Sequence, residues 1–319
     1  MTDYPAYLKA AKSGKLKKVA SALFDSLKSC AICPRLCSVN RLANKTGFCK
    51  TKKLAKVYSF MAHHGEEPPV SGKKGSGTIF FSHCNMKCVY CQNYEFSQLG
   101  KGSEYTINQL AEVMLNLQSL GCHNINLVTP THVLPQILSS LELAVAGGLK
   151  IPLVYNTSGY ELAETIKLLD GIVDIYLADM RYADSAISQK LSIASDYPQC
   201  NRIAIKEMYR QVGNAEFFTS GLMKRGLIIR HLVLPNCCSG TDKIMQFIAK
   251  EISENVYISL MSQYLPYHLA SGYLEINRRL KAEEYEEAKN ILKKYNLSNG
   301  WIQESYGEER FAGVNIKPA

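Results

Sequence analysis

The sequence predicts an α/β protein in which six buried strands alternate with helices. From residue 76 onward, short apolar runs of strand length alternate with segments whose apolar residues recur about every 3.6 residues. Repeats of this kind form either an open doubly wound sheet or a complete or partial barrel, and functional residues gather at the carboxyl ends of the strands in both. The composition, 46% hydrophobic and 20% charged, is that of a globular protein with a sizeable core.

Each element has a local signal. A helical stretch over residues 5–27 opens the chain, and Thr106 with Gln109 has the spacing of a capping box. Gly121 and Gly147 stand where helices would end. The predicted strands are 78–82, 125–129, 152–156, 173–178, 227–234 and 256–261. The predicted helices after residue 100 are 106–120, 133–146, 161–169, 185–194, 204–212, 241–252 and 283–295.

Composition also indicates the compartment. No run of about eighteen apolar residues occurs, and the lysine-rich residues 1–29 lack the apolar stretch of a secretory signal. We therefore expect a cytoplasmic protein without a membrane segment. Eleven cysteines in such a protein indicate metal ligands more than disulfides, because the cytosol keeps thiols reduced.

The positive charge is concentrated at one end. Residues 1–56 contain thirteen Lys or Arg against Asp3 and Asp25, a balance of +11, whereas residues 57–319 carry a balance of −2. A basic lobe can attract phosphates or an acidic protein surface. Lysine-rich first helices are also commonly just solvated, and we favour that simpler interpretation.

Cys84, Cys88 and Cys91 form the most informative motif, C-x3-C-x2-C, directly behind the first predicted strand. Three thiolates leave one iron of a four-iron cluster without a protein ligand, so a small molecule with an amine and a carboxylate can chelate it. The alternatives are a zinc loop or three unrelated buried thiols. Zinc sites usually pair such cysteines with a second pair or with histidines, and His83 is the only histidine nearby. The spacing favours a cluster that binds a ligand.

A second cysteine group lies nearer the N-terminus. Its four thiols suffice for a structural zinc site or a second iron–sulfur cluster, and a reduced group without metal is the alternative. The spacing does not separate zinc from iron. The group consists of Cys30, Cys33, Cys37 and Cys49. The remaining cysteines show no ligand pattern, and we interpret them as packing residues. They are Cys122, Cys200, Cys237 and Cys238.

Polar residues follow every predicted strand. Singly, each such segment is explained as a turn or a helix cap, because Thr, Asn, Ser, Asp and Gly serve those roles. Their joint position at the carboxyl ends of strands predicts one shared site. Beside the cysteine loop, the segments are 129–132, 156–159, 179–181, 235–236 and 263–268.

These residues resemble a known family. The run from Cys84 to Cys91, with a tyrosine before the last cysteine and Gln92-Asn93 after it, resembles the radical S-adenosylmethionine (SAM) superfamily. Within it, the chain is similar to pyruvate formate-lyase activating enzyme-like proteins, and Cys-Pro-Arg-x-Cys, Val-Thr-Pro-Thr-His and Arg-His-Leu-Val-Leu-Pro match one subgroup. The resemblance implies a partial (β/α)6 TIM-like barrel over 75–300, an N-terminal basic, cysteine-rich extension over 1–74 and a tail over 301–319.

The resemblance also implies the chemistry. Cys84, Cys88 and Cys91 would hold a 4Fe-4S cluster whose fourth iron binds SAM. An electron from a donor such as flavodoxin or ferredoxin would cleave SAM to methionine and a 5'-deoxyadenosyl radical, which abstracts hydrogen from a substrate. A glycyl radical enzyme is the expected protein substrate. The alternatives are RNA, a peptide or a small metabolite, or a structural metal-binding module; few aromatic residues in the basic lobe count against RNA.

The family pattern further implies which side chains contact SAM, and it assigns no catalytic side chain. The chain departs from the pattern at three points: a threonine stands where a glutamate often grips the methionine amine, Asn replaces Asp, and Arg replaces Lys. An arginine can clamp a carboxylate with two bonds, so the last change keeps the chemistry. The histidine of the set is equally explained as a loop residue. The implied contacts are Tyr90, Thr129, Asn156, Thr157, Asp179, Arg181 and His268.

Overall fold

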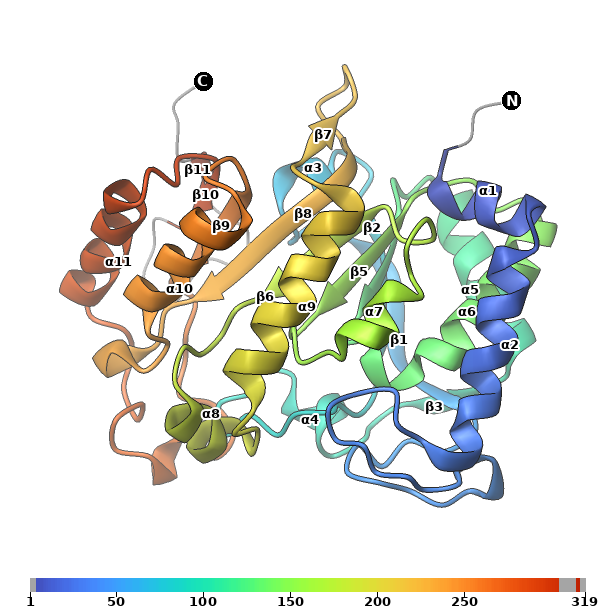
Figure 1. Ribbon diagram of the computed structural model, residues 1–319, viewed down its shortest axis with the longest axis horizontal. Helices are drawn as coiled ribbons and strands as arrows, with labels where there is room; N and C mark the ends of the chain where they lie inside the picture. Colours follow the sequence, from blue (N-terminus) through green and yellow to red (C-terminus); the bar gives the residue numbers. More distant parts are fainter. Residues whose placement is uncertain (1–3, 304–313, 316–319) are drawn as a thin grey trace.

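Six parallel strands lie side by side in the order in which the chain makes them (Figure 1). The computed structural model describes residues 4–303 and 314–315. A doubly wound sheet reverses its strand order at a switch point, and these strands do not, so the arrangement is that of a barrel wall. The strands are β2 (Ser76–Phe81), β4 (Ile125–Val128), β5 (Leu153–Thr157), β6 (Ile175–Asp179), β8 (Met223–Leu232) and β9 (Tyr257–Met261).

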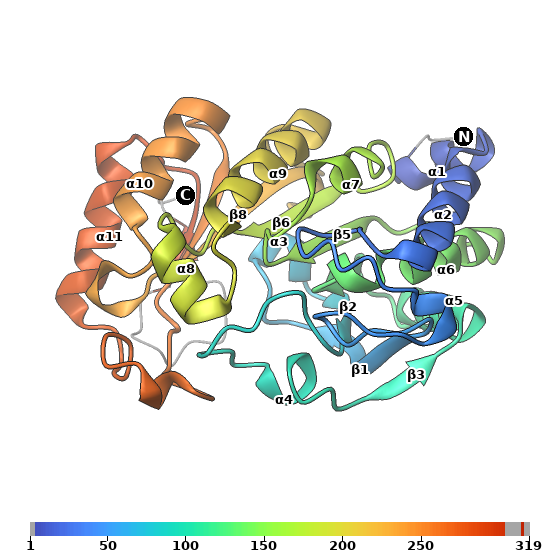
Figure 2. The same cartoon turned by 60° about the horizontal axis from the view of Figure 1, so that its bottom comes forward.

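Helices connect successive strands along the outer face of the curved sheet (Figure 2). Every helix predicted after residue 100 is present, and the capping box of Thr106 and Gln109 begins the first of them. They are α5 (Ile107–Ser119), α6 (Leu134–Ala146), α7 (Ala163–Lys167), α8 (Ser185–Ser192), α9 (Tyr197–Val212), α10 (Thr241–Phe247, continued by a π turn over Ile248–Ile252) and α11 (Ala282–Lys294). The predicted α/β partial barrel is therefore confirmed.

Additional strands extend the sheet at both edges. The strand β1 (Ala55–His63) pairs antiparallel with β2 and with β3 (Ser103–Tyr105). At the other edge, β10 (Gly300–Ile302) runs parallel to β9 and pairs with β11 (Val314–Asn315), while the short β7 (Glu216–Phe217) pairs with β8. In the described part of the chain the paired strands run from β11 to β3 without closing. Part of the segment 1–74 thus belongs to the sheet, and most of the predicted tail, 304–313 and 316–319, lies outside the described residues.

The N-terminal helix is divided in two. The single helix predicted over 5–27 consists of α1 (Ala6–Lys12) and α2 (Lys15–Ser26), because Gly14 adopts a left-handed conformation with φ 75° between them. Leu16, Val19 and Leu23 bury the inner face of α2 within the same apolar core as α6. After α2, residues 30–54 form a loop whose Arg35 donates from Nε to the carbonyl of Asn85, in the segment that joins β2 to α4 (Tyr94–Ser97). Within the residues described, no helix has the length and apolarity needed to cross a membrane.

Candidate functional site

A cavity of about 820 Å³ opens at the carboxyl ends of the parallel strands. The cysteine loop, which joins β2 to α4, supplies one wall, and residues from the ends of β4, β5, β6, β8 and β9 supply the others. Chemistry is expected at this end of a β/α barrel. Six of the seven predicted cofactor contacts line the cavity: Tyr90, Thr129, Asn156, Thr157, Asp179 and Arg181. Their contact with SAM stays a prediction.

His268 lies apart from the other predicted contacts. It does not line the cavity, and its ring stacks on Tyr94 with 4.7 Å between centroids. Tyr94 begins α4 directly after the cysteine loop, so His268 packs against that loop from outside. Its contact with the cofactor also stays a prediction.

Each thiol of the cysteine loop has a polar partner. The Met86 backbone N–H donates to Cys84 Sγ over 3.3 Å, and Ser97 Oγ lies 3.2 Å from Cys91 Sγ. Cys88 Sγ accepts from Ser192 Oγ at 3.0 Å and from Arg181 Nη1 at 3.2 Å. Donors of this kind favour anionic sulfur, so the surroundings fit thiolate ligands.

Burial opposes free thiolates in the same loop. It raises the pKa of Cys84 to about 12, with the neighbouring Cys88 adding to the effect. Burial and Cys88 also raise the pKa of Cys91. Thiols in this state release their protons when a metal centre binds, so cluster binding is coupled to pH.

Across residues 4–303, no group of three His, Cys, Asp or Glu side chains is arranged to hold a single metal ion. The cysteines of a four-iron cluster each bind a different iron. Cys84, Cys88 and Cys91 each have a donor beside the sulfur, so this donor set fits the 4Fe-4S cluster that the sequence predicts.

Tyrosines hold the cysteine loop in place. Tyr90 is buried and its hydroxyl lies 2.5 Å from that of Tyr182, which in turn lies 2.6 Å from Ser192 Oγ. Ser192 then reaches Cys88, so this hydrogen-bonded chain ends on a predicted cluster ligand. Tyr182 and Ser192 had no signal in the sequence, because they become neighbours of the loop only through the packing of α8.

Arg181 joins the cluster loop to the end of β6. Its Nε donates to Asp179 Oδ2 over 2.9 Å, while Nη1 reaches Cys88. Burial alone would lower the pKa of Arg181, but Asp179 and the neighbouring Cys88 and tyrosines together raise it. The guanidinium therefore stays charged beside the thiol that it contacts.

The threonines after β4 and β5 bind a buried glutamate. Glu161 is 1% exposed and accepts hydrogen bonds from Thr131 at 2.6 Å, Thr157 at 2.5 Å and Tyr155 at 3.2 Å. The hydroxyl of Thr157 is thus occupied by the protein, although the residue lines the cavity. Burial raises the pKa of Glu161 to about 7, and the hydrogen bonds only partly offset this.

This raised pKa makes stability depend on pH. Because folded Glu161 binds its proton more tightly than the unfolded chain, we expect the free energy of unfolding to fall by about 3 kcal/mol as pH rises from 4.5 to 7. Glu161→Gln should remove this decline, whereas Glu164→Gln, on the exposed face of α7, should keep it. Urea denaturation of the three chains across this range measures the effect. Parallel curves for the wild type and Glu161→Gln would contradict it.

A buried ion triad in the cavity escaped prediction from the sequence. Arg230 on β8 pairs with Glu66 and, over 2.8 Å, with Glu67, both from the segment after β1. Glu66 also accepts from Asn126 at 2.9 Å and Asn156 at 3.4 Å. Both glutamates and Arg230 line the cavity. The available signal was the charge of Arg230 inside an apolar strand, since a buried charge requires a partner.

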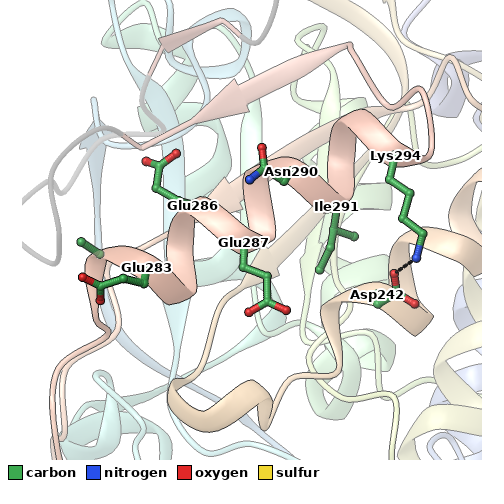
Figure 3. A pocket seen from close by; sticks show the side chains of 8 residues that line it. Asp242, Glu283, Glu286, Glu287, Asn290, Ile291 and Lys294 are labelled. Carbon is green, nitrogen blue, oxygen red and sulfur yellow. Dashed lines mark hydrogen bonds and ion pairs between the residues drawn. The ribbon is translucent and has the colours of Figure 1, made fainter.

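A second hollow lies away from this site. It has a volume of about 730 Å³ on the outer side of α10 and α11, and Glu283, Glu286 and Glu287 point around it (Figure 3). Its one lysine, Lys294, is paired with Asp242 at 2.6 Å. The cysteine loop and the strand ends contribute nothing to it, so we place the chemistry in the first cavity.

Comparison with known proteins gives one family match and one similar protein. Residues 78–180 match the family model described as the radical SAM superfamily. The uncharacterized protein MJ0674 of Methanocaldococcus jannaschii is 35% identical over 282 residues, which cover 85% of this chain and 76% of that protein.

Two solved structures are similar to parts of this chain. HydG, a maturase of the FeFe hydrogenase, superposes with a TM-score of 0.47 and 10% identity over 73% of this chain and 53% of its own, so the match spans about half of HydG. Methylornithine synthase (PylB) gives a TM-score of 0.42 and 13% identity over 90% of this chain and 70% of its own.

The matched segment begins within β2, contains the three-cysteine loop and ends at Met180, one residue before the arginine that contacts Cys88. The chain belongs to the radical SAM superfamily.

Proposed function

We propose that this protein is a cytoplasmic radical enzyme that abstracts a hydrogen atom from a protein partner, and that the partner is a glycyl radical enzyme. The observation that carries the proposal is the cysteine loop, whose three thiols each have a polar partner and whose Cys91 lines the strand-end cavity. When bound there, a 4Fe-4S cluster supplies one electron to SAM, which breaks into methionine and a 5'-deoxyadenosyl radical.

The protein's own residues would hold the cluster and set the charge around the cofactor. Cys84, Cys88 and Cys91 would hold the cluster, and Arg181 places a positive charge beside Cys88. On the other side of the cavity, two carboxylates of the buried triad face one guanidinium. This excess of negative charge suits a cofactor that carries both a sulfonium and an ammonium group. The residues of the cavity therefore support SAM as the ligand.

Apolar side chains beside the cavity support a protein substrate. Tyr267 lines the cavity and is 48% exposed, and Leu269 and Leu274 on the same segment are 56% and 89% exposed. The backbone N–H of Leu269 donates to the carbonyl of Val89 over 2.8 Å, which fixes this segment against the cysteine loop. Exposed apolar residues grouped near a site are typical of protein-binding surfaces. A small metabolite would not need them.

Anaerobic reconstitution tests the proposal. The full chain, loaded with iron and sulfide, should release 5'-deoxyadenosine when SAM and dithionite are added. No release from a fully loaded sample would overturn the radical chemistry. Pyruvate formate-lyase is the protein probe for the activase role, and it should acquire a glycyl radical that electron paramagnetic resonance (EPR) detects. Cleavage of SAM without that signal would contradict the activase role.

The exposed leucines allow a separate prediction. Leu274→Asp and Leu269→Asp should lower the rate of glycyl radical formation at least about tenfold, because each removes apolar contact area from the docking surface. The release of 5'-deoxyadenosine without partner should stay within about twofold of the wild type. Leu168→Asp is the control. Leu168 is also an exposed leucine, but it lies at the C-terminal end of α7, outside this surface. Equal rates for all variants would exclude this surface.

RNA is the second candidate substrate. The exposed lysines of α1 and α2 favour it, since a basic surface attracts phosphates. The aromatic rings of the same lobe disfavour it: Tyr7 is fully buried, and Phe48 is covered by the guanidinium of Arg35 at 3.7 Å from the ring centre. They leave little surface for base stacking. Salt-dependent retention of RNA by the full chain would favour this candidate.

A further inference from the structure

The four cysteines of the N-terminal group meet in one pocket. Although they span twenty residues of the loop between α2 and β1, their side chains line a single small cavity. Arg41 and His132 line the same cavity. Cys30 and Cys33 are buried, whereas Cys37 and Cys49 are partly exposed, so the pocket lies close to the surface. The four are Cys30, Cys33, Cys37 and Cys49.

The pocket is built around sulfur. The Phe48 backbone N–H donates to Cys37 Sγ over 3.4 Å, and Arg41, which is 1% exposed, places Nη1 3.6 Å from Cys30 Sγ. A Cβ atom at Gly47 would stand 2.6 Å from Cys37 Sγ, so only glycine leaves room for that thiol. N–H donors and a buried guanidinium both stabilise thiolates. A group of unliganded thiols would need neither.

Two side chains connect this pocket to the catalytic loop. Arg35, between Cys33 and Cys37, donates from Nε to the carbonyl of Asn85 over 2.8 Å. His132 places Nε2 2.8 Å from the carbonyl of Ser82. Ser82 lies two residues before Cys84 and Asn85 directly after it, so both connections end beside the first predicted ligand of the catalytic cluster. The other nitrogen of His132, Nδ1, is buried without a hydrogen-bond partner at the wall of the cysteine pocket.

We propose that Cys30, Cys33, Cys37 and Cys49 bind a second iron–sulfur cluster, and that an external one-electron carrier reduces the catalytic cluster through it. This rests on the proposed radical chemistry. No bond forms or breaks in the step: the reduced carrier loses one electron, the second cluster gains it and passes it to the cluster at Cys84, Cys88 and Cys91. The +11 balance of residues 1–56 suits a carrier with an acidic surface, such as a flavodoxin.

Iron is preferred over zinc at this pocket because its hydrogen-bonded connections lead to a redox centre. A zinc ion has no redox chemistry and would make no use of such connections.

The first experiment isolates the second cluster. The full-length variant Cys84→Ala/Cys88→Ala/Cys91→Ala is loaded anaerobically with iron and sulfide. It should keep about four irons and four sulfides per chain, and dithionite should produce an iron–sulfur EPR signal. Adding Cys37→Ser should abolish both, and adding Cys122→Ser, a buried cysteine outside the pocket, should not. A folded triple variant that binds one zinc, or no metal, would overturn the proposal.

The second experiment tests electron transfer. With reduced flavodoxin as the donor, Gly47→Ala and Cys37→Ser should slow the appearance of the reduced catalytic cluster, followed by EPR, at least about tenfold. With dithionite, which reaches the catalytic cluster directly, 5'-deoxyadenosine release should stay within about twofold of the wild type. Unchanged reduction by flavodoxin would overturn the relay. Failure of the radical chemistry itself is recognised separately, because the wild type would then release no 5'-deoxyadenosine with dithionite.

Discussion

Cys84→Ala should eliminate both the catalytic cluster and the release of 5'-deoxyadenosine. The cluster depends on three thiolates, and Cys84 is the one held by the Met86 N–H and approached by both connections from the N-terminal pocket. Loss of an outer partner of a metal ligand alone costs about 10–100-fold in affinity or activity, so loss of the ligand itself should leave below about 1% of wild-type release. Iron and sulfide content, EPR and 5'-deoxyadenosine measure the outcome.

Cys122→Ala is the matched control for this prediction. Cys122 is also a buried cysteine, 3% exposed, but it packs in the main core away from the cavity. The control should keep the iron content and activity of the wild type, at a modest cost in stability. A Cys84→Ala protein with wild-type activity would show that the loop does not hold the catalytic cluster.

The strands of the barrel were predictable because burial marks them. Both faces of β5 and β6 are covered, so they appear in the sequence as continuous apolar runs. The strand β1 was not predicted. It lies near the sheet edge, and a register shift between Val57 and Ser59 interrupts the alternation of buried and exposed residues. Within a basic, cysteine-rich region, this interrupted pattern is not distinguished from loop.

The candidate site was predictable only where its chemistry is local in sequence. Cys84, Cys88 and Cys91 lie within eight residues, so their spacing alone indicates a cluster. The pairing of Arg230 with Glu67 joins positions 163 residues apart. Nothing near either residue indicates the other, because the contact exists only after β1 and β8 take their places in the sheet.

The N-terminal pocket was also predictable only in part. Spacing indicated that its cysteines could share a metal. The connections through Arg35 and His132 depend on the N-terminal loop packing beside the catalytic loop, which only the folded chain shows. His132 lies 50 residues from its partner Ser82. The proximity of the two cysteine groups is therefore a property of the fold. It supports a role for the pocket in electron transfer to the catalytic loop.

The buried triad provides the second large effect. Arg230→Met should lower the free energy of unfolding by about 3–5 kcal/mol, because it leaves Glu66 and Glu67 unpaired in the cavity. Their side chains are only 6% and 1% exposed, so each carboxylate depends on Arg230 for a partner of opposite charge. Urea denaturation of the full chain at constant pH measures the difference. Arg210→Met is the control, because its arginine is 57% exposed and solvent screens its ion pairs, which should therefore contribute little to stability.

Removing all three charges together separates pairing from packing. In Glu66→Gln/Glu67→Gln/Arg230→Met no unpaired charge remains, and the amides can still accept from Asn126 and Asn156. We therefore expect this variant to recover most of the stability that Arg230→Met loses. If the loss came from the volume of the arginine side chain, neutral glutamines would recover none of it. If Arg230→Met costs no more than Arg210→Met, the triad does not hold the segment after β1 against β8.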